Sequence, residues 1–76
     1  MNYREYIGRD HKVMLGKPVI KGTRLTVELI LRKLGEGASP GELLLLYPQL
    51  TEKHLQVIMQ FAAELVANED HISAAS

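Results

Sequence analysis

The feature that most constrains the fold is a change of hydrophobic period within residues 16–34. The segment that begins at Gly16 reads Gly-Lys-Pro-Val-Ile-Lys-Gly-Thr-Arg, and its Val19 and Ile20 are β-prone residues that follow a proline. After Gly22 the apolar residues recur at helical spacing, at Val27, Ile30, Leu31 and Leu34. We expect Gly22 to adopt a positive φ, because a tight turn at this point requires it. The pattern predicts a short strand that turns sharply into a helix.

Capping residues predict the bounds of three helices, with N-caps at Thr26, Ser39 and Thr51. The first helix is expected to end near Gly35 and Gly37. Pro40 at the first helical position and Glu42 at the third complete a capping box with Ser39. Pro48 ends this second helix after Tyr47, at about two turns. The third helix is expected to run from residue 52 to about residue 68.

The N-terminal residues predict a small β appendage rather than a further helix. Tyr6 and Ile7 are expected to be extended, residues 8–11 to form a turn, and residues 13–15 to form a strand beside Val19 and Ile20. The chain is therefore one domain, with the appendage in residues 1–22, a three-helix core in residues 26–68 and a polar tail in residues 69–76. The predicted fold class is mainly α, a tri-helical helix-turn-helix core of the homeodomain-like or winged-helix-like kind.

The third helix carries more apolar residues than one short neighbour covers. The predicted stripe comprises Leu55, Ile58, Met59, Ala62, Leu65 and Val66, with Val57 and Phe61 on its flank. A chain of 76 residues with no cysteine has only a modest core and no disulfide to support it. We therefore predict a homodimer, whose contact involves the strand residues between Val13 and Ile20, Phe61 or its neighbours, or both.

Composition and spacing favour a binding protein over an enzyme. No apolar run is long enough to span a membrane, and residues 1–6 lack the apolar region of a signal peptide. Together with the lack of cysteine, this leads us to expect a cytoplasmic protein. His11, His54 and His71 share no metal-ligand spacing, so each is expected to be solvated or to cap a helix. The glycines around Lys21 do not match a phosphate-binding loop. We predict no catalytic residues, no metal and no cofactor.

Charge is unevenly distributed along a chain whose net charge is zero. Residues 1–33 hold eight Lys and Arg against three Asp and Glu, whereas residues 34–76 hold one against six. The halves therefore carry +5 and −5. This asymmetry fits an anion-binding N-terminal half, a head-to-tail contact between copies, or solubility alone.

A helix-turn-helix would make the third helix the recognition helix for DNA. That helix offers Lys53, Gln56 and Gln60 but no arginine, so the N-terminal cations would have to supply the affinity for phosphates. The predicted DNA-binding residues are Lys17, Lys21, Arg24, Arg32, Lys33, Lys53 and Gln56. Arg24 stands out because a fixed turn before the first helix would orient its guanidinium toward a carboxylate or a phosphate.

Residues 16–67 resemble the small prokaryotic family catalogued as domain of unknown function 433. The motif residues are Gly16, Lys17, Pro18, Val19, Ile20, Gly22, Thr23 and Arg24, followed by Ser39-Pro40, Glu42, Tyr47-Pro48 and Leu50-Thr51. Thr26 is a departure, because many members have proline there. Thr caps a helix equally well, so the same fold is expected.

The resemblance implies a VapB-type antitoxin that neutralises a PIN-like ribonuclease by binding it and that commonly represses its own operon. Arg24, or alternatively Arg9, would pair with the carboxylates of the nuclease. The tail, residues 68–76, has no Arg or Lys and does not suit an acidic site. The alternatives are a DNA-binding helix-turn-helix protein, or a small dimeric interaction module with no toxin partner.

Overall fold

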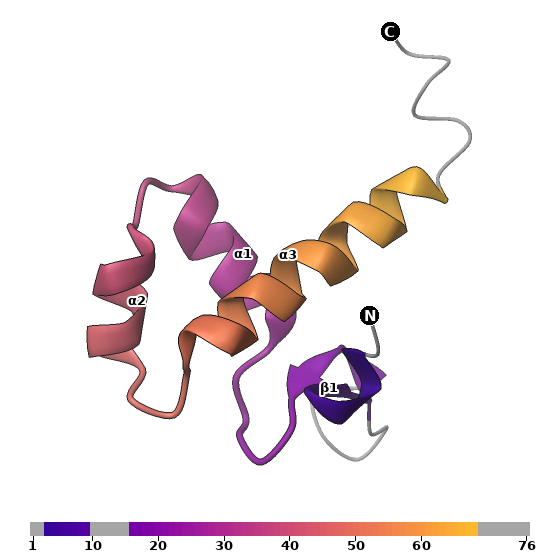
Figure 1. Ribbon diagram of the computed structural model, residues 1–76, viewed down its shortest axis with the longest axis horizontal. Coiled ribbons are helices and arrows are strands. Elements are labelled where there is room, and N and C mark those ends of the chain that lie inside the picture. Colours follow the sequence, from indigo (N-terminus) through magenta and orange to yellow (C-terminus); the bar gives the residue numbers. More distant parts are fainter. Residues whose placement is uncertain (1–2, 10–15, 69–76) are drawn as a thin grey trace, which may run out of the picture.

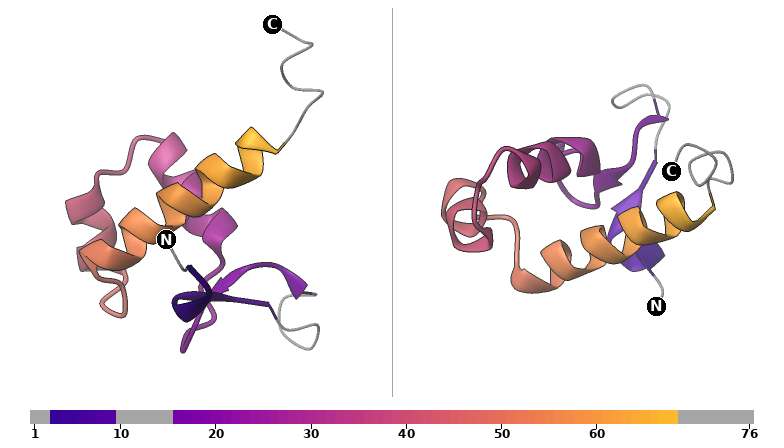
Figure 2. Two further views of the ribbon diagram at one scale, coloured as in Figure 1. Left: turned by 45° about the vertical axis from the view of Figure 1, so that its right-hand side comes forward. Right: turned by 90° about the horizontal axis from the view of Figure 1, so that it is seen from above.

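The computed structural model describes residues 3–9 and 16–68 (Figure 1). The described elements are a 3-10 turn η1 (Tyr3–Glu5), strands β1 (Ile7–Gly8) and β2 (Val19–Ile20), and helices α1 (Val27–Gly35), α2 (Pro40–Leu46) and α3 (Glu52–Ala67). Seen from above, α1 and α3 lie on opposite sides and α2 lies at the end where α3 begins (Figure 2). The predicted mainly α fold, a three-helix core with short N-terminal strands, is confirmed.

The first two helices begin at the predicted caps. The Thr26 hydroxyl accepts a hydrogen bond from the amide of Leu29 at 3.0 Å. The Ser39 hydroxyl accepts from the Glu42 amide at 3.1 Å, and the Glu42 carboxylate accepts from the Ser39 amide at 2.9 Å. These bonds satisfy amide groups that have no partner inside the helix. Beyond α1, Gly37 has a φ of +106°, which suits the chain reversal into α2.

The third helix has a capping box in which histidine replaces the usual acidic residue. The Thr51 hydroxyl accepts from the His54 amide at 3.3 Å, and His54 Nδ1 accepts from the Thr51 amide at 3.0 Å. The His54 ring also meets Tyr6 edge-on, with 5.7 Å between ring centroids. Of the two predicted roles of His54, solvated or capping, the structure shows capping. The side chain also connects α3 to the N-terminal segment through Tyr6.

A single apolar core joins all three helices and both strands. Its fully buried side chains are Ile20, Ile30, Leu43, Val57 and Ile58. Each helix and β2 contributes to this set, so the core depends on contacts between segments far apart in sequence. Burial of an aliphatic side chain contributes about 1.5–3 kcal/mol to folding, so these five positions dominate the stability of the domain.

The apolar stripe predicted on α3 is buried only in part within one chain. The buried residues of α3 are Leu55, Val57, Ile58 and Phe61. Met59, Leu65 and Val66, which were assigned to the apolar stripe, are exposed. The reason is that α3 contacts η1 as well as α1 and α2, and the Tyr3 ring lies 5.1 Å from that of Phe61. Its buried face therefore turns toward Val57 and Phe61, and the helix then extends beyond its neighbours (Figure 1).

The strand that pairs with β2 is also different from the expected one. β1 pairs with β2 in antiparallel register, with Ile7 opposite Ile20 and Gly8 opposite Val19. Gly8 was assigned to a turn, but it continues the strand because the buried side chain of Ile7 fixes this register against the core. The predicted strand at residues 13–15, the turn residues 10–11, His71 and the tail at residues 69–76 lie outside the described residues.

Candidate functional site

The segment between β2 and α1 is a turn in which the backbone is held by several hydrogen bonds. The carbonyl of Ile20 accepts from the Thr23 amide at 3.1 Å and from the Thr23 hydroxyl at 2.8 Å. The Thr23 hydroxyl accepts from the Leu25 amide at 3.0 Å, and the Ile20 amide donates to the Leu25 carbonyl at 2.9 Å. Gly22 has a φ of +82°, as predicted, because this place in the turn requires a positive φ.

Residues 21–24 of this segment, the cationic turn, display two positive charges to solvent. Lys21 and Arg24 are both exposed. Within the part of the chain that the structure describes, neither side chain makes a hydrogen bond or an ion pair. The Lys21 amide donates to the Tyr6 carbonyl at 2.8 Å, which anchors the turn to the N-terminal segment. A fixed backbone that carries two uncompensated cations is well suited to bind an anion.

Lys17 and Arg32, which were also predicted to bind anions, both form ion pairs with the carboxylate of Glu28. Glu28 accepts from Arg32 at 2.8 Å and from Lys17 Nζ at 3.0 Å. The Arg32 guanidinium, followed by the Lys17 ammonium, holds the pKa of Glu28 below its ordinary value of 4.5. All three side chains are about half exposed or more, so these ion pairs add little stability. They do reduce the positive charge that Lys17 and Arg32 present to a partner.

The remaining predicted residues lie on separate elements. Lys33 is half-buried on α1, whereas Lys53 and Gln56 are exposed on the first turns of α3. Arg9 is exposed just after β1. The predicted DNA-binding set therefore comes from the segment before β2, the cationic turn, α1 and α3, and no hydrogen bond or ion pair among the described residues joins the turn to α3.

The motif residues around the turn fix the start of α1. The Pro18 carbonyl accepts from the Val27 amide at 3.0 Å, and Val19 and Thr26 form an antiparallel bridge. Gly16 has a φ of +81°, which favours glycine at that position. Pro18, Gly22, Thr23 and Thr26 thus act together to hold β2 against α1, and this explains how the motif positions the cationic turn.

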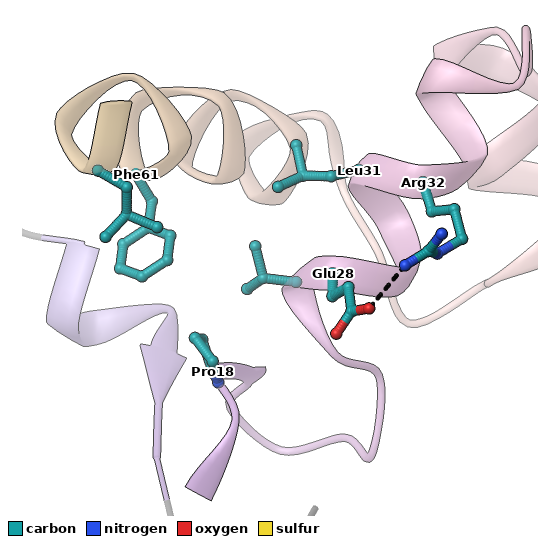
Figure 3. Close-up of a pocket in the computed structure, with 7 residues that line it drawn as sticks. Pro18, Glu28, Leu31, Arg32 and Phe61 are labelled. Carbon is teal, nitrogen blue, oxygen red and sulfur yellow. Dashed lines mark hydrogen bonds and ion pairs between the residues drawn. The ribbon is translucent and has the colours of Figure 1, made fainter. Parts of the chain in front are cut away.

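An apolar groove between α1 and α3 was not anticipated from the sequence. It has a volume of about 500 Å³. Figure 3 shows side chains from α1, α3 and the segment before β2 facing a common space, with the Glu28–Arg32 ion pair at its rim. The lining residues are Pro18, Val27, Glu28, Leu31, Arg32, Phe61 and Leu65. The signal in the sequence was the excess apolar surface of the third helix, but spacing alone did not show which residues form a groove.

The described residues show neither a metal-binding cluster nor a membrane-spanning helix. In residues 3–9 and 16–68, no group of three or more His, Cys, Asp or Glu side chains is placed to hold a metal ion. None of the described helices has both the length and the hydropathy needed to cross a membrane. The features that stand out in this part of the chain are thus the cationic turn and the apolar groove.

Comparison with known proteins identifies a family but no characterised relative. No curated protein and no solved structure gives a significant match to the chain. The sequence profile of the family described as "Protein of unknown function (DUF433)" matches residues 7–62, which include β1, the cationic turn, α1, α2 and most of α3. The chain therefore belongs to the DUF433 family.

Proposed function

We propose that this chain is a non-catalytic antitoxin that neutralises a PIN-like ribonuclease by binding it. The observation that carries the proposal is the cationic turn, in which Lys21 and Arg24 are exposed without partners among the described residues on a hydrogen-bonded backbone. The family resemblance supplies the nature of the partner. Because the bonds of Thr23 do not involve either cation, the turn keeps its shape when a cation binds a partner.

The chemistry of such a partner matches an arginine on a fixed turn. A PIN-like active site is a cluster of carboxylates around a divalent metal ion. The Arg24 guanidinium offers a planar fork that pairs with a carboxylate through two hydrogen bonds. Such a pair becomes strong when the interface excludes water and the donor is already oriented. In this proposal Arg24 occupies the acidic site, and Lys21 contributes to electrostatic steering.

Arg9 is an alternative to Arg24 as the residue that binds the nuclease, and the two would not bind the same carboxylate cluster together. In the antiparallel pair, Gly8 lies opposite Val19 and Ile7 opposite Ile20. The residues that follow the two strands, Arg9 and Lys21, therefore leave the pair at opposite ends. Arg9 lines a separate hollow of about 330 Å³, together with Tyr3 and Ile7. A single carboxylate cluster would meet one of these two ends, and the cationic turn offers two cations on a hydrogen-bonded backbone.

Co-expression with a nuclease encoded in the adjacent reading frame tests the proposal. We expect the two proteins to co-purify, and growth to be restored in cells that otherwise stop growing when the nuclease is expressed alone. Arg24→Ala is expected to weaken the complex by about tenfold to a hundredfold, because it removes a charge-assisted pair at an interface. Lys53→Ala, which removes an exposed cation from α3, is the matched control and should retain full protection.

The proposal fails if the chain purifies alone while the co-expressed nuclease remains toxic. If the complex forms and Arg24→Ala and Arg9→Ala both bind as tightly as the wild type, the antitoxin assignment stands but the cationic turn is not the contact. A loss of binding with Arg9→Ala alone would assign the contact to the other end of the strand pair.

DNA binding, including repression of its own operon, is a second candidate function. The arrangement that favours it is the helix-turn-helix order of α2 and α3, with Gln56 exposed near the start of α3 and Gln60 exposed in its middle. We expect weak binding to the DNA upstream of its own gene that falls steeply as salt is raised, because Lys21, Arg24 and Lys33 would contact phosphates. A gel shift at low and moderate salt tests this, and no shift at low salt would exclude it.

A further inference from the structure

We propose that the groove between α1 and α3 binds the C-terminal half of α3 from a second copy of the chain, in a symmetric homodimer. The C-terminal half of α3 is taken as residues 59–67, which include its exposed apolar side chains Met59, Leu65 and Val66. The inference goes beyond the antitoxin proposal, because it does not depend on whether a nuclease or DNA is bound. It identifies the two surfaces that would meet. Each of them leaves apolar side chains uncovered in a single copy.

The first surface is the groove itself, which is apolar and open. Phe61 on α3, Leu31 on α1 and Pro18 point into the same space (Figure 3). Leu65 and Val27 also line the groove. Grooves of this kind bind amphipathic helices, whose apolar side chains enter at positions three and four residues apart. A volume of about 500 Å³ accommodates a few aliphatic side chains of such a helix.

The second surface is the part of α3 that extends beyond the other helices (Figure 1). Leu65 is 48% exposed and Val66 59%, and Met59, about two turns earlier, is 55% exposed. Met59 and Val66 are seven residues apart, so they lie on one side of the helix and Ala62 or Ala63 lies between them. Small residues at that point allow another helix to approach closely. The exposed apolar side chains thus form a continuous strip rather than isolated positions.

The charges of the two surfaces are complementary. Glu28 and Arg32 line the groove, and Lys17 lies beside it, paired with Glu28. Two positive charges therefore stand against one carboxylate, which leaves one positive charge in excess. After Lys53, the charged residue of α3 is Glu64, and no basic residue lies in its last turn. The C-terminal end of a helix also carries the negative end of its dipole. The end of α3 is therefore attracted to the rim of the groove in another copy.

Symmetry supports a closed dimer. Leu65 belongs both to the wall of the groove and to the exposed strip. Because the two surfaces are contiguous on one molecule, a two-fold axis beside Leu65 brings each strip into the groove of the other copy. Such an arrangement contains the same contact twice and leaves no free end for further addition. The exposed Leu45 and Leu46 lie on α2, outside this contact.

Sedimentation equilibrium of the full chain at micromolar concentration tests the dimer. We expect the wild type to be a dimer and Val66→Glu to raise the dissociation constant by about a hundredfold, because a charge would enter an apolar contact. Leu45→Glu is the matched control, since Leu45 is 84% exposed on α2, and it should leave the dissociation constant unchanged. Far-UV circular dichroism should show that both variants retain the helical content of the wild type.

A charge exchange tests the proposed pairing of surfaces. Arg32→Glu and Glu64→Arg are each expected to weaken the dimer by about tenfold, whereas the double variant should restore an affinity near that of the wild type. A monomeric wild type would overturn the proposal, and so would a dimer that survives Val66→Glu or is broken by Leu45→Glu. Failure of the double variant to recover would also overturn it. A monomer that still neutralises the nuclease would leave the antitoxin proposal intact.

Discussion

Both halves of α3 carry large apolar residues, but most of these residues are buried in the first half and exposed in the second. In the first half, Leu55, Val57 and Ile58 are buried, whereas Met59, Leu65 and Val66 in the second half are about half exposed. The cause is that α3 is longer than α1 and α2. With 16 residues α3 spans about 24 Å, whereas α1 with nine and α2 with seven span about 14 and 11 Å. Apolar residues therefore continue along α3 after the helices that cover them have ended.

The first half of α3 therefore serves the fold, and the second half is available for binding. Burial of Val57 and Ile58 is complete within one chain, so substitutions there act on stability. Substitutions of Leu65 or Val66 are expected to act on association instead. The predictions that follow test this division.

The largest expected effect is the loss of a buried side chain from the first half of α3. Ile58→Ala should lower the free energy of unfolding by about 2–5 kcal/mol, because Ile58 is fully buried and its loss leaves a cavity. Val66→Ala should change it by less than about 0.5 kcal/mol. Urea denaturation followed by circular dichroism, at a protein concentration low enough to dissociate a dimer, measures both. Equal losses would contradict the division.

The next largest effect is the loss of stability when the N-cap of α3 is removed. Thr51→Ala should cost about 1 kcal/mol, because the His54 amide loses its acceptor and the capping box is broken. Glu64→Gln, in the second half of the helix, is the control and should be close to neutral. A thermal melt of the two variants shows the difference, and a Thr51→Ala protein as stable as the wild type would mean that the cap contributes nothing.

The smallest expected effect is a loss of stability at acid pH. It arises from Glu28 on α1 and Glu42 on α2, the two helices against which α3 packs. Glu28 has its pKa lowered by Arg32 and then Lys17, and Glu42 by the Ser39 amide and then its hydroxyl. Both carboxylates are ionised more readily in the folded chain than in the unfolded chain. Their contribution is therefore complete above the ordinary value of 4.5 and is lost as the pH falls below it through the lowered pKa.

Unfolding measured between pH 7 and pH 3 should consequently show a decline that begins near pH 4.5. Glu42→Gln is expected to make this decline shallower, since the amide side chain does not titrate. Gln49→Glu, an added carboxylate at an exposed position, is the control and should leave the onset unchanged. A decline that is identical in the wild type and Glu42→Gln would contradict the role assigned to the capping box.

The parts of the fold that depend on local chemistry could be predicted from the sequence. Thr26, Ser39 and Thr51 are N-caps because their hydroxyls reach amides three residues ahead, and this geometry needs no distant partner. Gly22 has a positive φ for an equally local reason. The exposed cations of the turn were also identified, because the fixed backbone that displays them is encoded within six residues, from Ile20 to Leu25.

The parts that depend on distant neighbours could not be predicted in the same way. The buried face of α3 is set by η1 as well as α1 and α2, so Val57 and Phe61 are buried where the helical period alone favoured Met59 and Val66. The pairing of β1 with β2 joins segments separated by residues 9–18. The groove likewise requires α1 and α3 to be placed side by side, which no spacing within either helix reveals.

The central claim is that the second half of α3 completes its burial in the groove of another copy. Isotope-filtered NMR on a mixture of labelled and unlabelled chains tests it most directly, because it records contacts between copies alone. The account predicts intermolecular cross-peaks between the methyl groups of Leu65 or Val66 in one copy and those of Val27 or Leu31 in the other. Their absence at a concentration where the protein is dimeric, or cross-peaks only from Leu45 and Leu46, would contradict the claim.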